Sequence, residues 1–212
     1  MDPLLPLFPL NVVLYPGEPL PLHIFEFRYR EMVQLCLDEG RPFGVVKAAD
    51  DAISGVGCTA RIRRVLRRYE DGRMDLLCAG ETRFRVREVF QERPYLTASV
   101  EPFAEGDDRE PVPPGVRERV ITQHMKLLEL AGERLRPGVY DNAERVSFLV
   151  ARNAGLDLDQ KQTVLELVTE AERMTYLAEH FARLIRTVRR SKRIDKLAQG
   201  DGHADSLPPD IT

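Results

Sequence analysis

Short apolar runs broken by prolines fill the first half of the chain, whereas the second half shows helical periodicity. The runs have the length or the period-two alternation of strands, and they lie at residues 4–10, 20–25, 44–48, 60–69, 74–78, 83–87 and 96–100. Two of them flank Glu70-Asp71-Gly72-Arg73, a typical hairpin turn. Prolines at positions 3, 6, 9, 19 and 21 remove hydrogen-bond donors, so we expect the first two strands at an edge or in irregular pairing. So many short strands within residues 1–104 favour a closed or nearly closed barrel.

One helix is expected inside this strand-rich half. Over residues 27–39 the apolar side chains recur at steps of three and four, and Gly40 follows as a stop signal. The stripe consists of Tyr29, Met32, Val33 and Cys36. It predicts an amphipathic helix that packs on the strands.

Residues 116–197 are expected to be helical almost throughout. The first long helix should stop at Pro137-Gly138, and pairs of N-cap and acid at Asp141/Glu144 and Thr169/Glu172 should open two more. The last helix carries one continuous apolar face, made by Met174, Leu177, Phe181, Leu184, Ile185 and Val188. Residues 105–115, rich in acids, proline and glycine, are expected to be a linker, and residues 198–212 a disordered tail. The fold class predicted is α+β, strands first and helices second.

Composition and charge exclude several classes of function. The 212 residues carry a net charge of −3, so the molecule as a whole does not attract polyanions. Three cysteines without a C-x-x-C spacing indicate a reducing compartment, which we take to be the cytoplasm. The start of the chain, with Asp2 and Pro3, is unlike a signal peptide, and no apolar run reaches the roughly 20 residues of a membrane-spanning helix. We expect no membrane association.

Motifs for catalysis or for a cofactor are not found. No lysine follows a glycine, so there is no P-loop, and no G-x-S-x-G elbow occurs. The glycines at 55 and 57 match a loose dinucleotide fingerprint, but the pattern that follows is that of a strand and not of a helix. The four histidines are scattered, which gives no metal spacing, and Cys36 and Cys78 are expected to be buried. We predict a noncatalytic protein without cofactor or metal.

Arginine outnumbers lysine by 26 to 5, and five arginines gather on one expected strand: Arg61, Arg63, Arg64, Arg67 and Arg68. This cluster makes RNA binding an alternative function. Few aromatic residues lie among these arginines, and acids follow at Glu70, Asp71 and Asp75, so a charged strand edge exposed to solvent is the favoured interpretation. Nucleic acid is therefore the less expected partner.

Several segments together resemble the N-terminal substrate-binding domain of the Lon protease family. In the first half these are Pro6-Leu7-Phe8-Pro9-Leu10, Val13-Leu14-Tyr15-Pro16-Gly17, Leu20-Pro21-Leu22-His23-Ile24-Phe25-Glu26, Arg28-Tyr29-Arg30, Phe43-Gly44-Val45-Val46, Gly57-Cys58-Thr59-Ala60-Arg61-Ile62, Asp71-Gly72-Arg73-Met74-Asp75-Leu76-Leu77 and Pro94-Tyr95-Leu96. The second half adds the less distinctive Asp159-Gln160-Lys161-Gln162 and Leu165-Glu166. The resemblance implies a PUA-like β pseudo-barrel followed by a helical bundle. It also implies recognition of unfolded or damaged polypeptides. We expect a stand-alone version without ATPase and protease modules, with a protease acting in trans as a candidate partner.

One departure from the family pattern concerns Phe27, where the family usually has proline. On a helical wheel Phe27 points nearly opposite the stripe of Tyr29 and Met32, so we expect it off the buried face. An aromatic ring there can contact an apolar client segment or pack against the preceding turn. The candidate polypeptide-binding residues are therefore Tyr15, Phe27 and Arg28.

Overall fold

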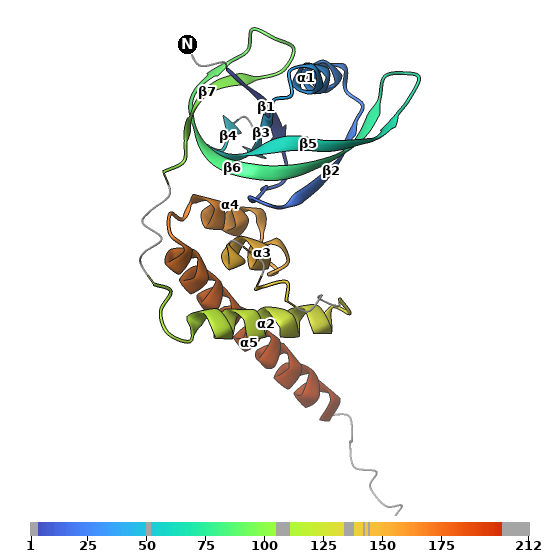
Figure 1. The fold of residues 1–212 in the computed structure, drawn as a ribbon. Helices are drawn as coiled ribbons and strands as arrows, with labels where there is room; N and C mark the ends of the chain where they lie inside the picture. The colour runs from blue at the N-terminus through green and yellow to red at the C-terminus, as the bar shows by residue number, and fades with distance from the viewer. Residues whose placement is uncertain are drawn as a thin grey trace, which may run out of the picture.

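The computed structural model describes residues 4–49, 52–104, 111–133, 138–141, 143 and 145–200, and for 49 and 187–200 it describes the backbone alone. Seven strands come first and four of the five helices follow (Figure 1). The predicted α+β class is confirmed. Residues 105–110 lie outside the described part, so the linker and the boundaries at 104 and 115 stay predictions.

Five strands form a pseudo-barrel. They are neighbours in the order β1 (Leu5–Leu10), β7 (Thr97–Pro102), β6 (Met74–Phe90), β5 (Val56–Arg68) and β3 (Phe43–Ala49). Parallel pairing of β1 with β3 joins the two ends of this order. Two strands lie off it, because β4 (Ala52–Ile53) pairs with β3, and β2 (Pro19–Ile24) pairs with the first part of β6.

The first two strands were expected at an edge or in irregular pairing, and β2 takes the edge position whereas β1 does not. Among the described strands β2 pairs with β6 alone, whereas β1 lies between β3 and β7. Its pairing with β7 is short and ends before Pro9, so this proline interrupts no bond to β7.

The predicted hairpin between β5 and β6 is present. Tyr69 donates its N–H to the carbonyl of Arg73 at 2.9 Å, and Gly72 takes the positive φ of 85° that the turn needs. The segments expected at 74–78 and 83–87 prove to be one strand of 17 residues, β6. Of the glycine fingerprint, Gly55 lies in the bend before β5 and Gly57 lies in this strand, so a strand and not a helix follows, as expected. A Cβ at Gly57 would meet the carbonyl oxygen of Val45 at 2.5 Å.

Helix α1 (Phe27–Asp38) covers one end of the pseudo-barrel. Its four buried residues are those of the predicted stripe: Tyr29, Met32, Val33 and Cys36. They pack on Phe43, Leu76 and Cys78 of the strands. Burial of each large apolar side chain contributes roughly 1.5 to 3 kcal/mol to folding.

The helical part contains α2 (Val116–Leu130), α3 (Val146–Arg152), α4 (Leu158–Glu166) and α5 (Glu170–Gly200). Two predicted boundaries are wrong. The first helix ends at Leu130 and not at Pro137-Gly138, because Gly132 adopts a φ of 76° and its N–H bonds the carbonyl of Glu129. The next helix begins at Val146 with Arg145 at its N-cap position, and not at Asp141; Glu144 of the expected pair lies outside the described residues.

The predicted capping box at Thr169 is confirmed. Glu172 N–H donates to Thr169 Oγ1 at 3.1 Å, and Thr169 N–H donates to Glu172 Oε2 at 2.9 Å. On α5, Met174, Leu177 and Phe181 are buried as expected, while the expected Val188 side chain and the tail from residue 201 lie outside the described part. No described helix is both long and apolar enough to cross a membrane.

One hydrophobic core joins the two halves. Val13, Tyr15 and Val56 of the strand-rich half pack with Phe148 and Leu165 of the helices. Figure 1 shows α3 and α4 lying directly beneath the barrel. The halves therefore share buried surface and are not merely tethered.

Candidate functional site

The corner between β2 and α1 exposes two phenylalanines. The strand ends at Ile24, and the carbonyl of Glu26 accepts the N–H groups of Tyr29 and Arg30 to begin the helix. Phe25 and Phe27 flank Glu26, and 60% and 69% of their surfaces are exposed. The predicted position of Phe27 off the buried stripe is confirmed. Such exposure argues against packing on the preceding turn and leaves the ring free to touch another molecule.

Charged neighbours hold this corner in place. The Nε of Arg28 donates to Glu26 Oε2 at 2.9 Å, and its guanidinium lies over the ring of Tyr29 at 4.6 Å. The guanidinium of Arg30 lies 5.6 Å from the centre of the Phe27 ring and donates to the carbonyl of Asp71 in the hairpin turn. The corner is thereby tied to the hairpin.

Tyr15 does not belong to this surface. Its side chain is fully buried, its ring stacks on Phe148 at 5.3 Å, and its hydroxyl donates to the carbonyl of Lys161 at 2.9 Å. Burial raises the pKa of this hydroxyl far above its ordinary value. The expectation that Tyr15 contacts a client is therefore corrected, because the helical half covers it.

A polar cluster at the base of the hairpin adjoins Phe25. His23 Nδ1 lies 2.5 Å from Asp75, the hydroxyl of Tyr69 donates to the same carboxylate at 2.8 Å, and the His23 ring stacks on Phe25. The hydrogen bond from His23, followed by that from Tyr69, lowers the pKa of Asp75. Asp75 thus stays ionised and fixes the two rings beside it.

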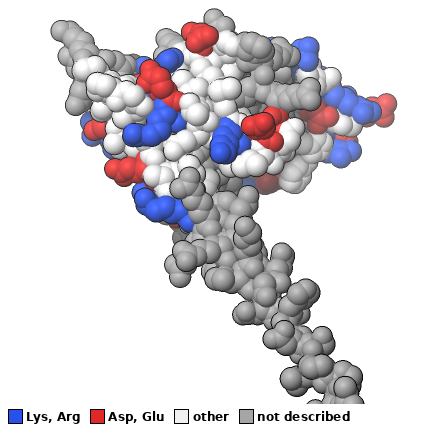
Figure 2. All heavy atoms as spheres, turned by 90° about the horizontal axis from the view of Figure 1, so that it is seen from below, with Lys and Arg blue, Asp and Glu red and all other residues white. Residues whose placement is uncertain are grey.

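The five arginines of β5 that were the candidate nucleic-acid-binding residues have different surroundings. Arg61 and Arg63 both reach Glu81, at 2.7 and 3.3 Å, and Arg68 donates to Gln34 at 3.3 Å. Arg67 lies over the ring of Tyr69 at 4.5 Å, and Arg64 is exposed. The strand brings them to one end of the molecule, and Figure 2 shows basic side chains there with acidic ones among them.

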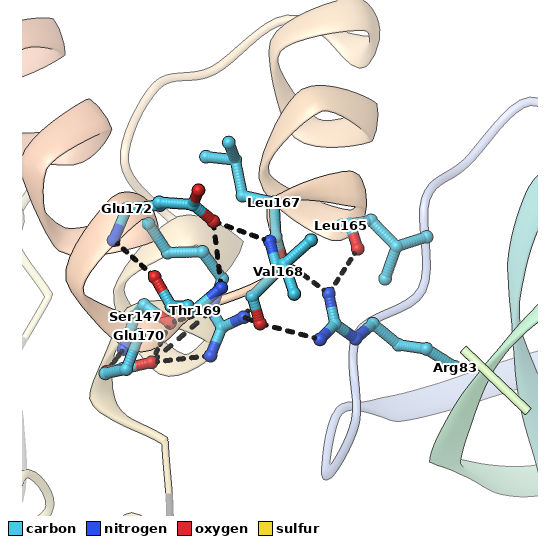
Figure 3. Close-up of polar contacts among 9 residues, drawn as sticks. Arg83, Ser147, Leu165, Leu167, Val168, Thr169, Glu170 and Glu172 are labelled. Carbon is cyan, nitrogen blue, oxygen red and sulfur yellow. Dashed lines mark hydrogen bonds and ion pairs between the residues drawn. The ribbon is translucent and has the colours of Figure 1, made fainter. Parts of the chain in front are cut away.

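Two further arginines that the sequence patterns did not predict bind backbone carbonyls around the C-terminal end of α4, and Arg83 thereby joins the two halves (Figure 3). Arg83 on β6 donates to the carbonyls of Leu165 and Leu167 at 2.8 and 2.6 Å. Arg173 on α5 donates to Leu167 at 3.0 Å and pairs with Glu170 at 3.0 Å. Both side chains are buried, and they satisfy the carbonyls at the C-terminal end of α4. Alternation along β6 places Arg83 on the same side as the exposed Arg85, so the burial of Arg83 could not be predicted from the pattern of the strand.

The described residues offer little for catalysis. Cys36, Cys58 and Cys78 are buried and free, and burial raises the pKa of Cys36 to about 11 and of the other two to about 12. The expected burial of Cys36 and Cys78 is confirmed. No group of three metal-ligating side chains occurs in the ranges that the structure describes. One hollow of about 170 Å³ is lined by residues that include Glu18 and Lys161, and another of about 380 Å³ by residues that include Glu172 and Tyr176. Neither lining contains a cysteine, a serine or a histidine.

Comparison with known proteins identifies the class. The family model of the substrate-binding domain of ATP-dependent protease La (LON) matches residues 4–183, so the chain belongs to this family. It is 29% identical over 213 residues to Lon protease 2 of Myxococcus xanthus and to Lon protease of Anaeromyxobacter dehalogenans, and covers 26% and 25% of their lengths. The chain thus spans about a quarter of these relatives.

Solved structures agree with this assignment. The crystal structure of a Lon N-terminal domain protein from Xanthomonas campestris matches 82% of this chain and 96% of its own, with 27% identity and a TM-score of 0.67. The N-terminal domain of Mycobacterium avium complex Lon protease matches 85% of this chain and 98% of its own, with a TM-score of 0.59. At 18% identity the second likeness concerns the fold alone.

Proposed function

We propose that this chain is a noncatalytic module that binds exposed apolar segments of unfolded or damaged polypeptides through the corner of Phe25, Phe27 and Arg28. The observation that carries the proposal is the pair of largely exposed phenylalanines, held on a fixed helix start, in a domain of a substrate-binding family. Exposed aromatic rings at fixed positions are typical anchors in binding surfaces. In the cell this binding would serve protein quality control in the cytoplasm, with a protease acting on the captured client.

The corner is suited to weak and general capture. Phe27 and Phe25 offer apolar surface, and the stems of Arg28 and Arg30 add apolar cover around charged tips. Neither ring is needed for the core, because α1 packs through its opposite face. Loss of either ring should therefore weaken binding without unfolding the protein.

The test is retention of a permanently unfolded, alkylated polypeptide on the immobilised chain. Phe27→Asp is expected to reduce retention several-fold and to leave the melting temperature unchanged. Leu130→Asp is the matched control, because Leu130 is exposed on α2, far along the chain from the corner. If the parent and Phe27→Asp retain the unfolded polypeptide equally, the corner is not the binding site. If the parent retains the same polypeptide equally well when it is folded, the proposed function is wrong.

RNA binding by β5 is the second candidate function, and the exposed Arg64 and Arg67 favour it. The dependence of binding on salt concentration distinguishes the two candidate functions. RNA affinity should collapse between low and moderate salt because phosphate contacts release counterions, whereas capture by the phenylalanines should change much less.

A further inference from the structure

The three strands β2, β6 and β5 share an outer face on which apolar and basic residues mix. Residues directly opposite each other in paired strands point to the same side. Asp75 and Leu77 of β6 lie opposite Arg67 and Arg64 of β5, and opposite His23 and Pro21 of β2. The neighbouring residues Met74 and Leu76 are buried against α1, so this row faces outward. We call it the outer face and define it by Pro21, His23, Arg64, Arg67, Asp75 and Leu77.

The outer face carries more positive charge than its own acids neutralise. Arg61 and Arg63 share the single carboxylate of Glu81. Within the described residues, Arg64 and Arg67 have no carboxylate within ion-pair distance. Asp75 lies opposite Arg67 but is already bound by His23 and Tyr69. Two guanidinium groups are thus available to acids of another molecule.

The outer face runs into the phenylalanine corner. His23 is the residue before the last of β2 and stacks on Phe25, which is two residues from Phe27. Leu77 lies in the row beside the arginines, and the exposed Leu66 lies in a register shift of β5 between Val65 and Arg67. An extended segment crossing this surface would meet guanidinium groups and aromatic rings in turn.

Recognition here must use side chains, because both strand edges are blocked. The register shifts of β5 bend its free edge, and prolines 19 and 21 remove donors from β2. Strand addition, which would ignore side-chain identity, is therefore disfavoured. The charge of the segment can then decide its affinity.

We propose that the chain prefers client segments with acidic residues beside their apolar ones, the acids binding Arg64 and Arg67 and the apolar groups contacting Phe25 and Phe27. This preference rests on the proposed polypeptide binding. A polypeptide fits better than RNA, because the ring of Tyr69, which lies beside these arginines, is already in contact with Arg67 and Arg73 and is not free to stack on a base.

The experiment compares three labelled peptides of equal length and apolar content by fluorescence polarisation with the full chain. They carry two glutamates, two glutamines or two lysines at the same positions. We expect the glutamate peptide to bind about three- to tenfold more tightly than the glutamine peptide, because two exposed ion pairs contribute about this much. The lysine peptide should bind most weakly, because its charges repel those of Arg64 and Arg67. Higher salt should narrow the difference.

Variants assign the effect to residues. Arg64→Gln with Arg67→Gln should abolish the preference and leave the affinity for the glutamine peptide unchanged. Arg119→Gln with Arg186→Gln, both on exposed helix surfaces, should leave the preference intact. Equal affinity for the glutamate and glutamine peptides would overturn the charge preference while the polypeptide function stands. Failure of all three peptides to bind, with tight binding of a single-stranded RNA of similar length, would overturn both.

Discussion

Arginine has two opposite roles in this molecule, one in the buried interior and one on the outer face. Arg83 at the junction of the halves and Arg173 within the helical part are buried, and they donate to carbonyl oxygens, Ser147 and Glu170 (Figure 3). On the outer face, Arg64 and Arg67 are exposed and lie without an ion-paired carboxylate among the described residues. Arginine therefore stabilises the fold where the protein supplies acceptors for its donors, and remains available for binding where the protein supplies none.

Removing the buried ion pair of Arg173 should have the largest effect. Arg173→Met leaves the carboxylate of Glu170 without its ion pair and removes the hydrogen bonds to the carbonyls of Leu167 and Val168, which should lower the free energy of unfolding by about 3–5 kcal/mol. Urea denaturation measures the loss. Arg186→Met, on the exposed surface of the same helix, should change it by less than about 0.5 kcal/mol. A similarly small change for Arg173→Met would show that this buried ion pair does not stabilise the helical part.

A buried ionisable group without a counterion should respond to pH. His124 lies on α2, its Nδ1 is 2.8 Å from the hydroxyl of Tyr140, and burial lowers its pKa to about 4. The unfolded chain then binds more protons between about pH 6.5 and 4, so stability is full above pH 6.5 and falls as pH drops, by about 2–3 kcal/mol in all. Urea titrations at several pH values test this. His124→Gln should flatten the slope in this window, and an unchanged slope would contradict the assignment.

A smaller effect is expected where Tyr15 links the halves. Tyr15→Phe removes the hydroxyl that donates to Lys161 and should cost about 1 kcal/mol, because one buried carbonyl loses its partner. Thermal melting measures this loss. Retention of unfolded polypeptide should not change, since the side chain is buried, and reduced retention by the folded variant would restore Tyr15 to the binding surface.

The smallest effect on stability is expected at the corner. Phe25→Ala and Phe27→Ala remove rings that are mostly in water, so each should change the free energy of unfolding by less than about 0.5 kcal/mol. Chemical denaturation of both variants tests this. A loss above 1 kcal/mol would mean that the rings pack against the protein and would weaken the case for a binding surface.

Local patterns predicted local structure well. The stripe of α1, the hairpin at Asp71-Gly72 and the exposure of Phe27 all follow from periodicities within a few residues. The burial of Tyr15 and Arg83 does not, because their partners Lys161 and Leu165 lie 146 and 82 residues away in the chain. The end of α2 at Leu130 and the start of α3 at Val146 also differ from the prediction. The positive φ of Gly132 ends α2, and the periodicity of apolar residues did not show this.

The core shared by both halves sets the smallest piece of chain that can be handled as a unit. A cut within residues 105–115 would leave Tyr15 and Val56 on one fragment and Phe148 and Leu165 on the other, each newly exposed to water. Such fragments would be prone to aggregate or to recombine. Fusion proteins and shuffled chimaeras should therefore carry the barrel and its helices together.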